Sequence, residues 1–298
     1  MKNVLFFTET KWAFGSIHYA LTKYLFQYGI NADVINWCES FPLIDFEMFI
    51  NKYDYFVTTP SALNALKSYG VPDHKIVLIA HGEIDIKVAK DQLGSDVCNG
   101  VYKYAVVSEK LKEKSIEFGV NRIPDVISVG INFDFFYSKV PKELKTIGFT
   151  GAHTTDYLPI DIKRFKLVNE VSHNTNIPIA MHQRYHFLGM PTYYHSVDCV
   201  MMASTEESVC LPMLEGAASG RLCIGTSVGI FDNGKNRQGA IIIESFDEQT
   251  YIDNTTRILN FYKENQSNFI LKCHEIQNYA YENYDWKYHI ESWINLFN

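Results

Sequence analysis

Residues 198–220 have the sequence DCVMMASTEESVCLPMLEGAASG. The apolar run Cys199–Met202 predicts a buried strand, and the polar residues that follow it predict a turn. Pro212 suits the first position of a helix, and Gly220 suits the position just after its end. A strand, a turn and a helix in this order place main-chain N–H groups and the positive end of a helix dipole at the carboxyl edge of a sheet. Because α/β proteins bind anionic ligands at that edge, the segment predicts an α/β fold with an anion-binding site.

Short apolar runs alternate with helical patterns along the rest of the chain. The predicted strands lie at 4–7, 32–35, 55–58, 76–80, 104–107, 146–151, 177–181, 199–202, 222–224 and 240–243. The predicted helices include 16–28, 62–69, 109–118, 248–264 and 267–283. Most of the strands are continuous apolar runs without alternation, as in a parallel sheet that helices cover on both faces. This order predicts a doubly wound α/β fold.

A polar segment interrupts this order near the middle of the chain. Residues 139–145, KVPKELK, contain a proline and suit a linker. Residues 146–151, TIGFTG, then resemble the first strand and turn of a new α/β unit. We therefore predict a domain boundary near residue 141.

The composition is that of a folded globular protein. Of 298 residues, 47% are apolar and 20% charged, with 17 Gly and 9 Pro, which excludes a disordered, collagen-like or low-complexity chain. A chain of this length usually folds as two domains. The net charge of −7 disfavours a dedicated nucleic-acid binder, which is normally basic.

Several features bear on the cellular location and on metals. The apolar run Val4–Phe7 is too short for a signal-peptide core, and no stretch approaches the ~20 apolar residues of a membrane span. The six cysteines form no Cys-x-x-Cys pair, which favours free thiols in a reducing compartment. No His-Glu-x-x-His pattern occurs, so no metal site is predicted. We expect a cytoplasmic protein and leave a peripheral membrane contact and the oligomeric state open.

Residues 198–220 resemble the donor-binding signature of retaining glycosyltransferases of the GT-B fold, family 4 type (group 1). The shared features are a Ser-x-x-Glu turn ending at Glu207, a Leu-Pro step and a second glutamate, Glu215, after seven intervening residues. The flanks at 191–198 and 220–229 resemble the lead-in and the exit of that signature. Weaker similarities follow the order of the family at 14–16, 80–82, 105–108, 129–136 and 284–286.

The resemblance implies an α/β fold of two Rossmann-like domains that face a central cleft. Residues 1–141 would form the acceptor-side domain, and 142–283 would form the nucleotide-sugar-binding domain. A closing helix at 284–298 would cross back and pack on the first domain.

The resemblance also implies which residues would bind the donor. Glu215 would hold the ribose, while Glu207 and His81 would contact the transferred sugar as the catalytic residues. The main-chain N–H groups expected to help hold the donor belong to Ser208, Val209, Cys210 and Leu211.

The phosphates of the donor need positive charge and a close approach of the main chain. By resemblance, Lys163 would bind them, with Arg164 beside it, and Gly15 would let the main chain come near. The family usually has an arginine where this chain has Ala152, so either part of the phosphate clamp is absent, or Arg164 or His153 replaces it.

The implied reaction moves a hexose from a nucleotide-diphosphate sugar to a glycan, a lipid-linked molecule or another hydroxyl acceptor, with retention of configuration. The chain has no Asp-x-Asp motif, so no obligatory metal and no other cofactor are expected. The nucleotide sugar and the acceptor are thus the expected partners.

Other interpretations stay open at this stage. The chain could be a sugar transferase for hydroxymethyl-pyrimidine bases in DNA, although its net acidity counts against nucleic acid, or a non-catalytic nucleotide-sugar-binding protein. Glu207 and Glu215 could be surface carboxylates at a helix start, and His81 a structural histidine. Lys163 and Arg164 could belong to a solvated helix face.

Overall fold

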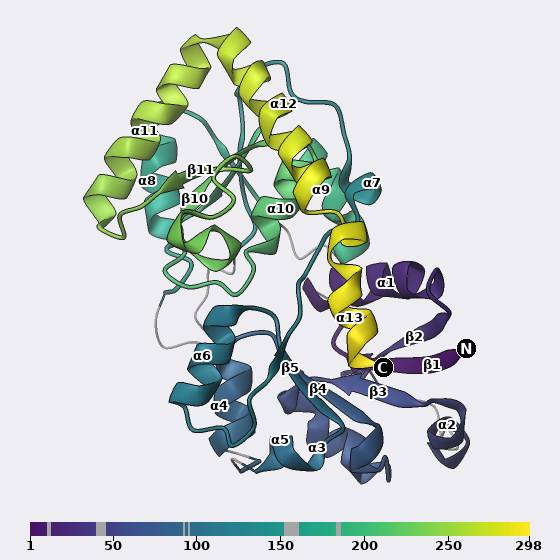
Figure 1. The fold of residues 1–298 in the computed structure, drawn as a ribbon. Coiled ribbons are helices and arrows are strands. Elements are labelled where there is room, and N and C mark those ends of the chain that lie inside the picture. Colours follow the sequence, from purple (N-terminus) through teal and green to yellow (C-terminus); the bar gives the residue numbers. More distant parts are fainter. Residues whose placement is uncertain (11–12, 40–45, 92, 95, 152–160, 183–185) are drawn as a thin grey trace. The chain divides into compact units, whose positions relative to one another are not determined.

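The computed structural model describes residues 1–10, 13–39, 46–91, 93–94, 96–151, 161–182 and 186–298. The chain forms two compact units, the first made of Met1–Gly130 with Trp286–Asn298 and the second of Ile131–Asp285. Each unit has one parallel sheet with helices packed around it (Figure 1). The chain therefore has the predicted fold of two Rossmann-like domains, with a C-terminal segment that returns to the first.

The first unit has a six-stranded parallel sheet in the order β2-β1-β3-β4-β5-β6. Its strands are β1 (Lys2–Thr8), β2 (Ile30–Asn36), β3 (Tyr55–Thr58), β4 (Ile76–Ala80), β5 (Lys103–Val106) and β6 (Asp125–Val126). The first five confirm the predicted strands, and β3 and β4 have the predicted bounds. The two-residue strand β6 has no apolar run that could have predicted it.

Helices pack on both faces of this sheet. They are α1 (Ala13–Phe26), α2 (Phe46–Lys52), α3 (Pro60–Ser68), α4 (Glu83–Asp91), α5 (Val97–Gly100), α6 (Glu109–Glu117) and α13 (Ile290–Leu296). The sheet order reverses at β1, so right-handed crossovers place α1 on one face and α3, α4 and α6 on the other. The returning helix α13 packs against α1 (Figure 1).

The second unit has a five-stranded parallel sheet in the order β11-β10-β9-β7-β8. Its strands are β7 (Ile147–Phe149), β8 (Ile179–Met181), β9 (Cys199–Met202), β10 (Leu222–Thr226) and β11 (Ile241–Ile243). Its helices are α7 (Phe133–Phe136), α8 (Phe165–Thr175), α9 (Met190–His195), α10 (Leu211–Ala218), α11 (Glu248–Glu264) and α12 (Gln266–Asn283). All residues of β9 and β10 are buried, as expected for a central strand pair covered on both faces. Helix α8 packs against α11, and α10 packs against α12 (Figure 1).

The second unit begins before the predicted boundary at residue 141. The carbonyl of Ser138 accepts a hydrogen bond of 2.8 Å from Gln277, and the carbonyl of Lys139 accepts one from Arg221. The carbonyl of Lys142 accepts another, of 2.8 Å, from Gln266. These bonds tie residues 138–142 to α12 and to Arg221, which directly precedes β10, and the division between the units falls after Gly130 instead.

The closing segment also differs in detail from the helix predicted at 284–298. Tyr284 and Asp285 still belong to the second unit, where the main chain of Ile131 pairs with them. A 3₁₀ turn at Trp286–Tyr288 follows, and helix α13 begins at Ile290. Within the described ranges, no helix is long and apolar enough to cross a membrane.

Candidate functional site

The second sheet has a topological switch point between its neighbouring strands β7 and β9. After β7 the chain runs through α8 to β8 on one side, whereas after β9 it runs through α10 to β10 on the other. The connections therefore diverge at the carboxyl ends of β7 and β9, which is where open α/β sheets bind ligands. The loops that leave these strands carry Lys163 and Glu207.

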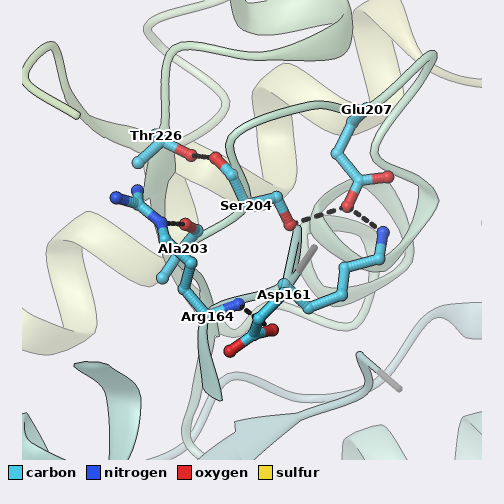
Figure 2. Close-up of polar contacts among 7 residues, drawn as sticks. Asp161, Arg164, Ala203, Ser204, Glu207 and Thr226 are labelled. Atoms are coloured by element: carbon cyan, nitrogen blue, oxygen red, sulfur yellow. Dashed lines mark hydrogen bonds and ion pairs between the residues drawn. The ribbon is translucent and has the colours of Figure 1, made fainter. Parts of the chain in front are cut away.

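Hydrogen bonds hold these two loops together. The main-chain N–H of Thr205 donates to the carbonyl of Ile162 at 3.0 Å. Arg164 Nε donates to the carbonyl of Ala203 at 2.6 Å, and Thr226 Oγ1 donates to the carbonyl of Ser204 (Figure 2). The main chain of the two loops is thus held in place at the switch point, with Thr226 at the end of β10 adding a third hydrogen bond.

Glu207 is held from two sides at this position. Its Oε1 forms an ion pair with Lys163 Nζ and accepts a hydrogen bond of 2.8 Å from Ser204 Oγ (Figure 2). The side chains of Lys163 and Glu207 are 29% and 13% exposed, while Ser204 is fully buried. A cation and an anion that both reach solvent here can exchange their mutual contact for a charged ligand.

Arg164 is buried and holds the main chain in place. Its backbone is left-handed, with φ of 47°, and Asp161 Oδ1 accepts from its N–H at 2.8 Å. Its Nη1 donates to the carbonyl of Phe246 at 2.7 Å, and its guanidinium lies 6.0 Å from the ring centre of Tyr251. Arg164 precedes α8 and is 6% exposed, so the alternative of a solvated helix face is wrong for it. Its predicted part in phosphate binding stays a prediction.

The loop Ser208–Leu211 leads into α10 through a left-handed residue. Cys210 has φ of 66° and ψ of 50°, and α10 begins at Leu211. Pro212 is therefore the second residue of the helix, one position later than predicted. The predicted stop, Gly220, lies just after the helix with φ of 72°. Burial raises the pKa of the Cys210 thiol well above its ordinary value, so this cysteine is neutral.

Glu215 lies in the interior of α10 and contacts α9. It is 5% exposed, and its Oε2 accepts a hydrogen bond of 2.9 Å from Tyr194 OH. Burial raises the pKa of Tyr194 well above its ordinary value, so the phenol keeps its proton and donates it. The alternative that Glu215 is a surface carboxylate is therefore wrong.

The other two predicted residues, His81 and Gly15, lie in the first unit. His81 follows β4, and its ring centre lies 4.7 Å from that of Phe14, the residue before Gly15. Its Nε2 is buried and has no hydrogen-bond partner among the described residues. Burial lowers the pKa of His81 to about 3, so the imidazole is neutral. Gly15 lies in the first turn of α1, whereas the resemblance placed it in a turn before the helix.

The sequence assigned no individual role to four contacting residues. They are Ser204 and Tyr194, which donate to Glu207 and Glu215, Asp85, which accepts from the N–H of His81, and His18, whose ring centre is 5.8 Å from that of His81. The sequence carried a signal for Asp85, because an acidic side chain at the third position of a helix often accepts a hydrogen bond from a main-chain N–H just before the helix. Ser204 had a signal in its spacing from Glu207. Tyr194 lies in the flank 191–198, whose resemblance to the lead-in marks no single residue, and His18 lies on the buried face of α1, next to apolar residues.

Two further points complete the description of the site. Ala152 and His153, where the sequence departs from the family, lie outside the described residues. Among the residues that are described, no group of three or more His, Cys, Asp or Glu side chains could hold a metal ion.

Known proteins resemble this chain in two ways, by the sequence of part of the second unit and by the fold. The family model "Glycosyl transferases group 1" matches residues 164–260, a range that includes Glu207 and Glu215. No curated protein sequence matches the chain.

Solved structures of similar fold share little sequence with the chain. HepE from Anabaena in complex with UDP-glucose has a TM-score of 0.67 at 12% identity, with 99% of both chains covered. An alpha-glucosyltransferase in complex with UDP and a 13-mer DNA containing a HMU base has a TM-score of 0.70 at 10% identity, again with 99% of both chains covered. TarM from S. aureus, in complex with fondaparinux, alpha-GlcNAc-glycerol and UDP, has a TM-score of 0.61 at 13% identity. The match covers 82% of this chain and 55% of TarM, so the chain spans little more than half of TarM's length. These similarities identify the fold as the two-domain GT-B fold.

Proposed function

We propose that the protein transfers a sugar from a nucleotide-diphosphate sugar to a hydroxyl acceptor, with retention of configuration and without an obligatory metal. One observation carries the proposal: the Lys163–Glu207 pair lies at the switch point of the second sheet, beside the loop that starts α10. This arrangement offers a cation, a carboxylate and a helix N-terminus at one place, and such groups suit a substrate with both phosphates and sugar hydroxyls. The match of the family model over this region supports it.

The phosphates are assigned to Lys163 and the start of α10. As the bond to the sugar breaks, negative charge grows on the departing diphosphate. Lys163 can turn from Glu207 to that charge, and the N–H groups near Leu211 add the positive end of the helix dipole. With this charge supplied by the chain, the reaction needs no metal. Arg164 supports the site from below by binding the carbonyls of Ala203 and Phe246.

The sugar and the ribose are assigned to carboxylates and to one imidazole. Released from Lys163, Glu207 can accept hydrogen bonds from hydroxyls of the transferred hexose, with Ser204 holding its position. Glu215 can accept both hydroxyls of the ribose. His81 is neutral, so it acts as a hydrogen-bonding group toward the sugar and not as a general acid.

Turnover of a donor panel in the presence of EDTA tests the proposal. UDP-glucose, UDP-N-acetylglucosamine, GDP-mannose and ADP-glucose are incubated with the protein and simple glycan or glycerol acceptors, and the anomeric protons are followed by NMR. We expect consumption of one α-linked donor, release of its nucleoside diphosphate and an α-linked product, and we expect Glu207→Gln to be much slower. A β-linked product would overturn retention, and loss of turnover that only added Mg²⁺ or Mn²⁺ restores would overturn metal independence. No turnover of any donor, with nucleotide still bound, would favour a non-catalytic binding protein.

A transferase for hydroxymethyl-pyrimidine bases in DNA is the second candidate. The observation in its favour is the fold similarity to the alpha-glucosyltransferase in complex with HMU-containing DNA. The net charge of −7 counts against it, because DNA binding depends on phosphate contacts from basic residues. A duplex containing HMU serves as the acceptor in the same assay. Glucose transfer to this duplex, with rates that fall steeply as salt is raised, would establish this candidate.

A further inference from the structure

Asp85 is a buried carboxylate directly behind the strand end that carries His81. It is the third residue of α4 and is 7% exposed. Its Oδ2 accepts a hydrogen bond of 2.8 Å from the main-chain N–H of His81, and the N–H of Gly82 also bonds to this carboxylate. The carboxylate thus binds both residues of the turn between β4 and α4.

Burying the ionised carboxylate of Asp85 costs the folded protein free energy. Burial raises the pKa of Asp85 to about 6, and the two main-chain N–H groups act in the opposite direction. At neutral pH the group is therefore ionised in the interior, a state that proteins usually avoid unless hydrogen bonds compensate. A neutral Ser or Asn at position 82, just before the helix, could cap the same helix without this cost. A buried charge at this place is better explained by the turn it holds than by the helix alone.

The turn has one chemically distinctive side chain, the imidazole of His81. Strand β4 is entirely buried, so the main chain is well fixed up to Ala80. Beyond Ala80, the bonds to Asp85 hold the N–H groups of His81 and Gly82. The backbone orientation of His81, and with it the position of its side chain, therefore depends on Asp85.

We propose that Asp85 is a positioning residue for sugar transfer, which holds the main chain of His81 so that the imidazole meets the donor sugar in one orientation. The inference rests on the proposed function, because it gives Asp85 no contact with substrate and lets it act only through His81. The alternative is that Asp85 only caps α4. In that case its loss lowers stability without any coupling to His81 in catalysis.

A double-mutant cycle on turnover separates these roles. Wild type, Asp85→Ala, His81→Ala and the double variant are compared by kcat and KM for release of the nucleoside diphosphate, using whichever donor of the panel the wild type cleaves. Assays run at a temperature at which every variant is folded. We expect Asp85→Ala to lower kcat about tenfold or more with KM changed less than about threefold, since a misplaced group chiefly weakens the transition state. In the His81→Ala background the same change should cost less than about twofold, because little is left to position.

Matched variants complete the experiment. Asp85→Asn keeps an acceptor oxygen at the same reach and should restore most of kcat. Glu83→Ala removes the other acidic side chain of the first turn of α4 and should leave kcat unchanged. If Asp85→Ala does not fold, Asp85→Ser takes its place in the cycle.

Each outcome decides between the two roles. Equal losses of kcat in both backgrounds, a full kcat in Asp85→Ala, or a full kcat in His81→Ala would each overturn the inference while transfer itself stands. A wild type that cleaves no donor would overturn the proposed function, and the inference would fall with it.

Discussion

Lys163 and Glu207 form an ion pair that a bound diphosphate would have to open. Two other charged residues of the second unit have settled contacts instead. The guanidinium of Arg164 binds the carbonyls of Ala203 and Phe246, and that of Arg221 binds those of Val197 and Ser219. The two buried arginines thus hold the main chain, whereas the partly exposed Lys163 and Glu207 can contact a ligand.

Glu215→Gln should weaken the binding of UDP, or of whichever nucleoside diphosphate the wild type prefers. Two ribose hydroxyls can donate to a carboxylate, whereas an amide offers one oxygen, and a lost hydrogen bond to a charged group costs about 1.5–3 kcal/mol. We expect Kd to rise about tenfold or more in calorimetric titration. The 2′,3′-dideoxy analogue is the control, and it should bind both proteins equally. Equal affinity of the two proteins for the natural nucleotide would remove Glu215 from the site.

His18→Phe should make the protein less sensitive to acid. His18 is 2% exposed, stacks on Phe6 at 4.8 Å, and has a pKa well below the ordinary value because of burial and of the nearby His81. Its folded-state pKa is depressed, so below about pH 6.5 the unfolded chain binds a proton that the folded chain refuses, and stability is lost as pH falls. The variant should gain up to about 1.4 kcal/mol per pH unit over wild type below that pH.

Urea unfolding of both proteins at pH 7.5, 6.5 and 5.5 checks this difference. His81, with its lowered pKa, acts in the same direction as His18, and Asp85, with a pKa raised to about 6, acts in the opposite one. Both groups are present in wild type and variant, so the difference between the two curves isolates His18. Parallel curves would mean that His18 takes up its proton in the folded protein.

At the scale of elements, the loop after β10 packs against the loop before α10 and restricts its conformation. Gly229 has φ of 63°, and a Cβ at this position would lie 2.9 Å from the carbonyl carbon of Val209 and 3.2 Å from Cys210 N. The two loops are therefore in direct main-chain contact. The loop before α10 can keep its left-handed turn at Cys210 only while residue 229 has no side chain.

Gly229→Ala should raise the donor KM about tenfold, because the added methyl group pushes Val209 and Cys210 away from the position at which we propose that they bind the donor. Gly234→Ala is the matched control. Gly234 also has a positive φ, of 76°, but its Cβ would meet only the guanidinium of Arg237. Both variants should lose stability, by about 1 kcal/mol for the strained backbone, while only Gly229→Ala changes KM. Equal KM values for the two variants would contradict the role given to this contact.

The elements were predictable from sequence where they are long or wholly apolar. The bounds of β4, β9 and α11 agree with the prediction, because an uninterrupted apolar run or a sustained helical period marks them. The two glutamates were singled out by the resemblance of residues 198–220 to the glycosyltransferase signature, and their roles stay predictions. Their partners Ser204 and Tyr194 were not assigned roles, because a hydrogen bond between side chains depends on how strands and helices pack. For the same reason the sequence could not tell that Arg164 would be buried while Lys163 would pair with Glu207.

At the scale of the whole molecule, the chain leaves the first unit and returns to it. Trp286 and Trp293 are fully buried there, with ring centres 6.1 Å apart, and Trp293 Nε1 donates to the carbonyl of Ser128 at 2.7 Å. The second unit is thus inserted between two parts of the first. Stability of the first unit therefore depends on the last residues of the chain.

Trp293→Ala should lower the stability of the first unit and spare nucleotide binding by the second. Removing a buried tryptophan side chain costs about 3–5 kcal/mol. In scanning calorimetry with UDP, we expect an earlier transition for the first unit and an unchanged transition for the unit that the nucleotide stabilises. Tyr288→Ala, at an exposed aromatic residue of the same segment, is the control and should change neither transition. A variant that loses UDP binding while the first transition stays in place would contradict this division.

The central claim is that the switch point of the second sheet binds the diphosphate of the donor. Calorimetric titration of UDP, GDP, ADP and CDP into wild type, Lys163→Met and Lys166→Met tests it most directly. Lys166→Met is the control. Lys166 carries the same charge as Lys163 and is nearby in sequence, but it is exposed and its Nζ pairs with Glu248 at 2.8 Å, away from Glu207. We predict that wild type binds one of the four, that Lys163→Met binds it at least about tenfold more weakly, and that Lys166→Met binds it as wild type does. Binding of none of the four, or equal affinities in wild type and Lys163→Met, would contradict the account.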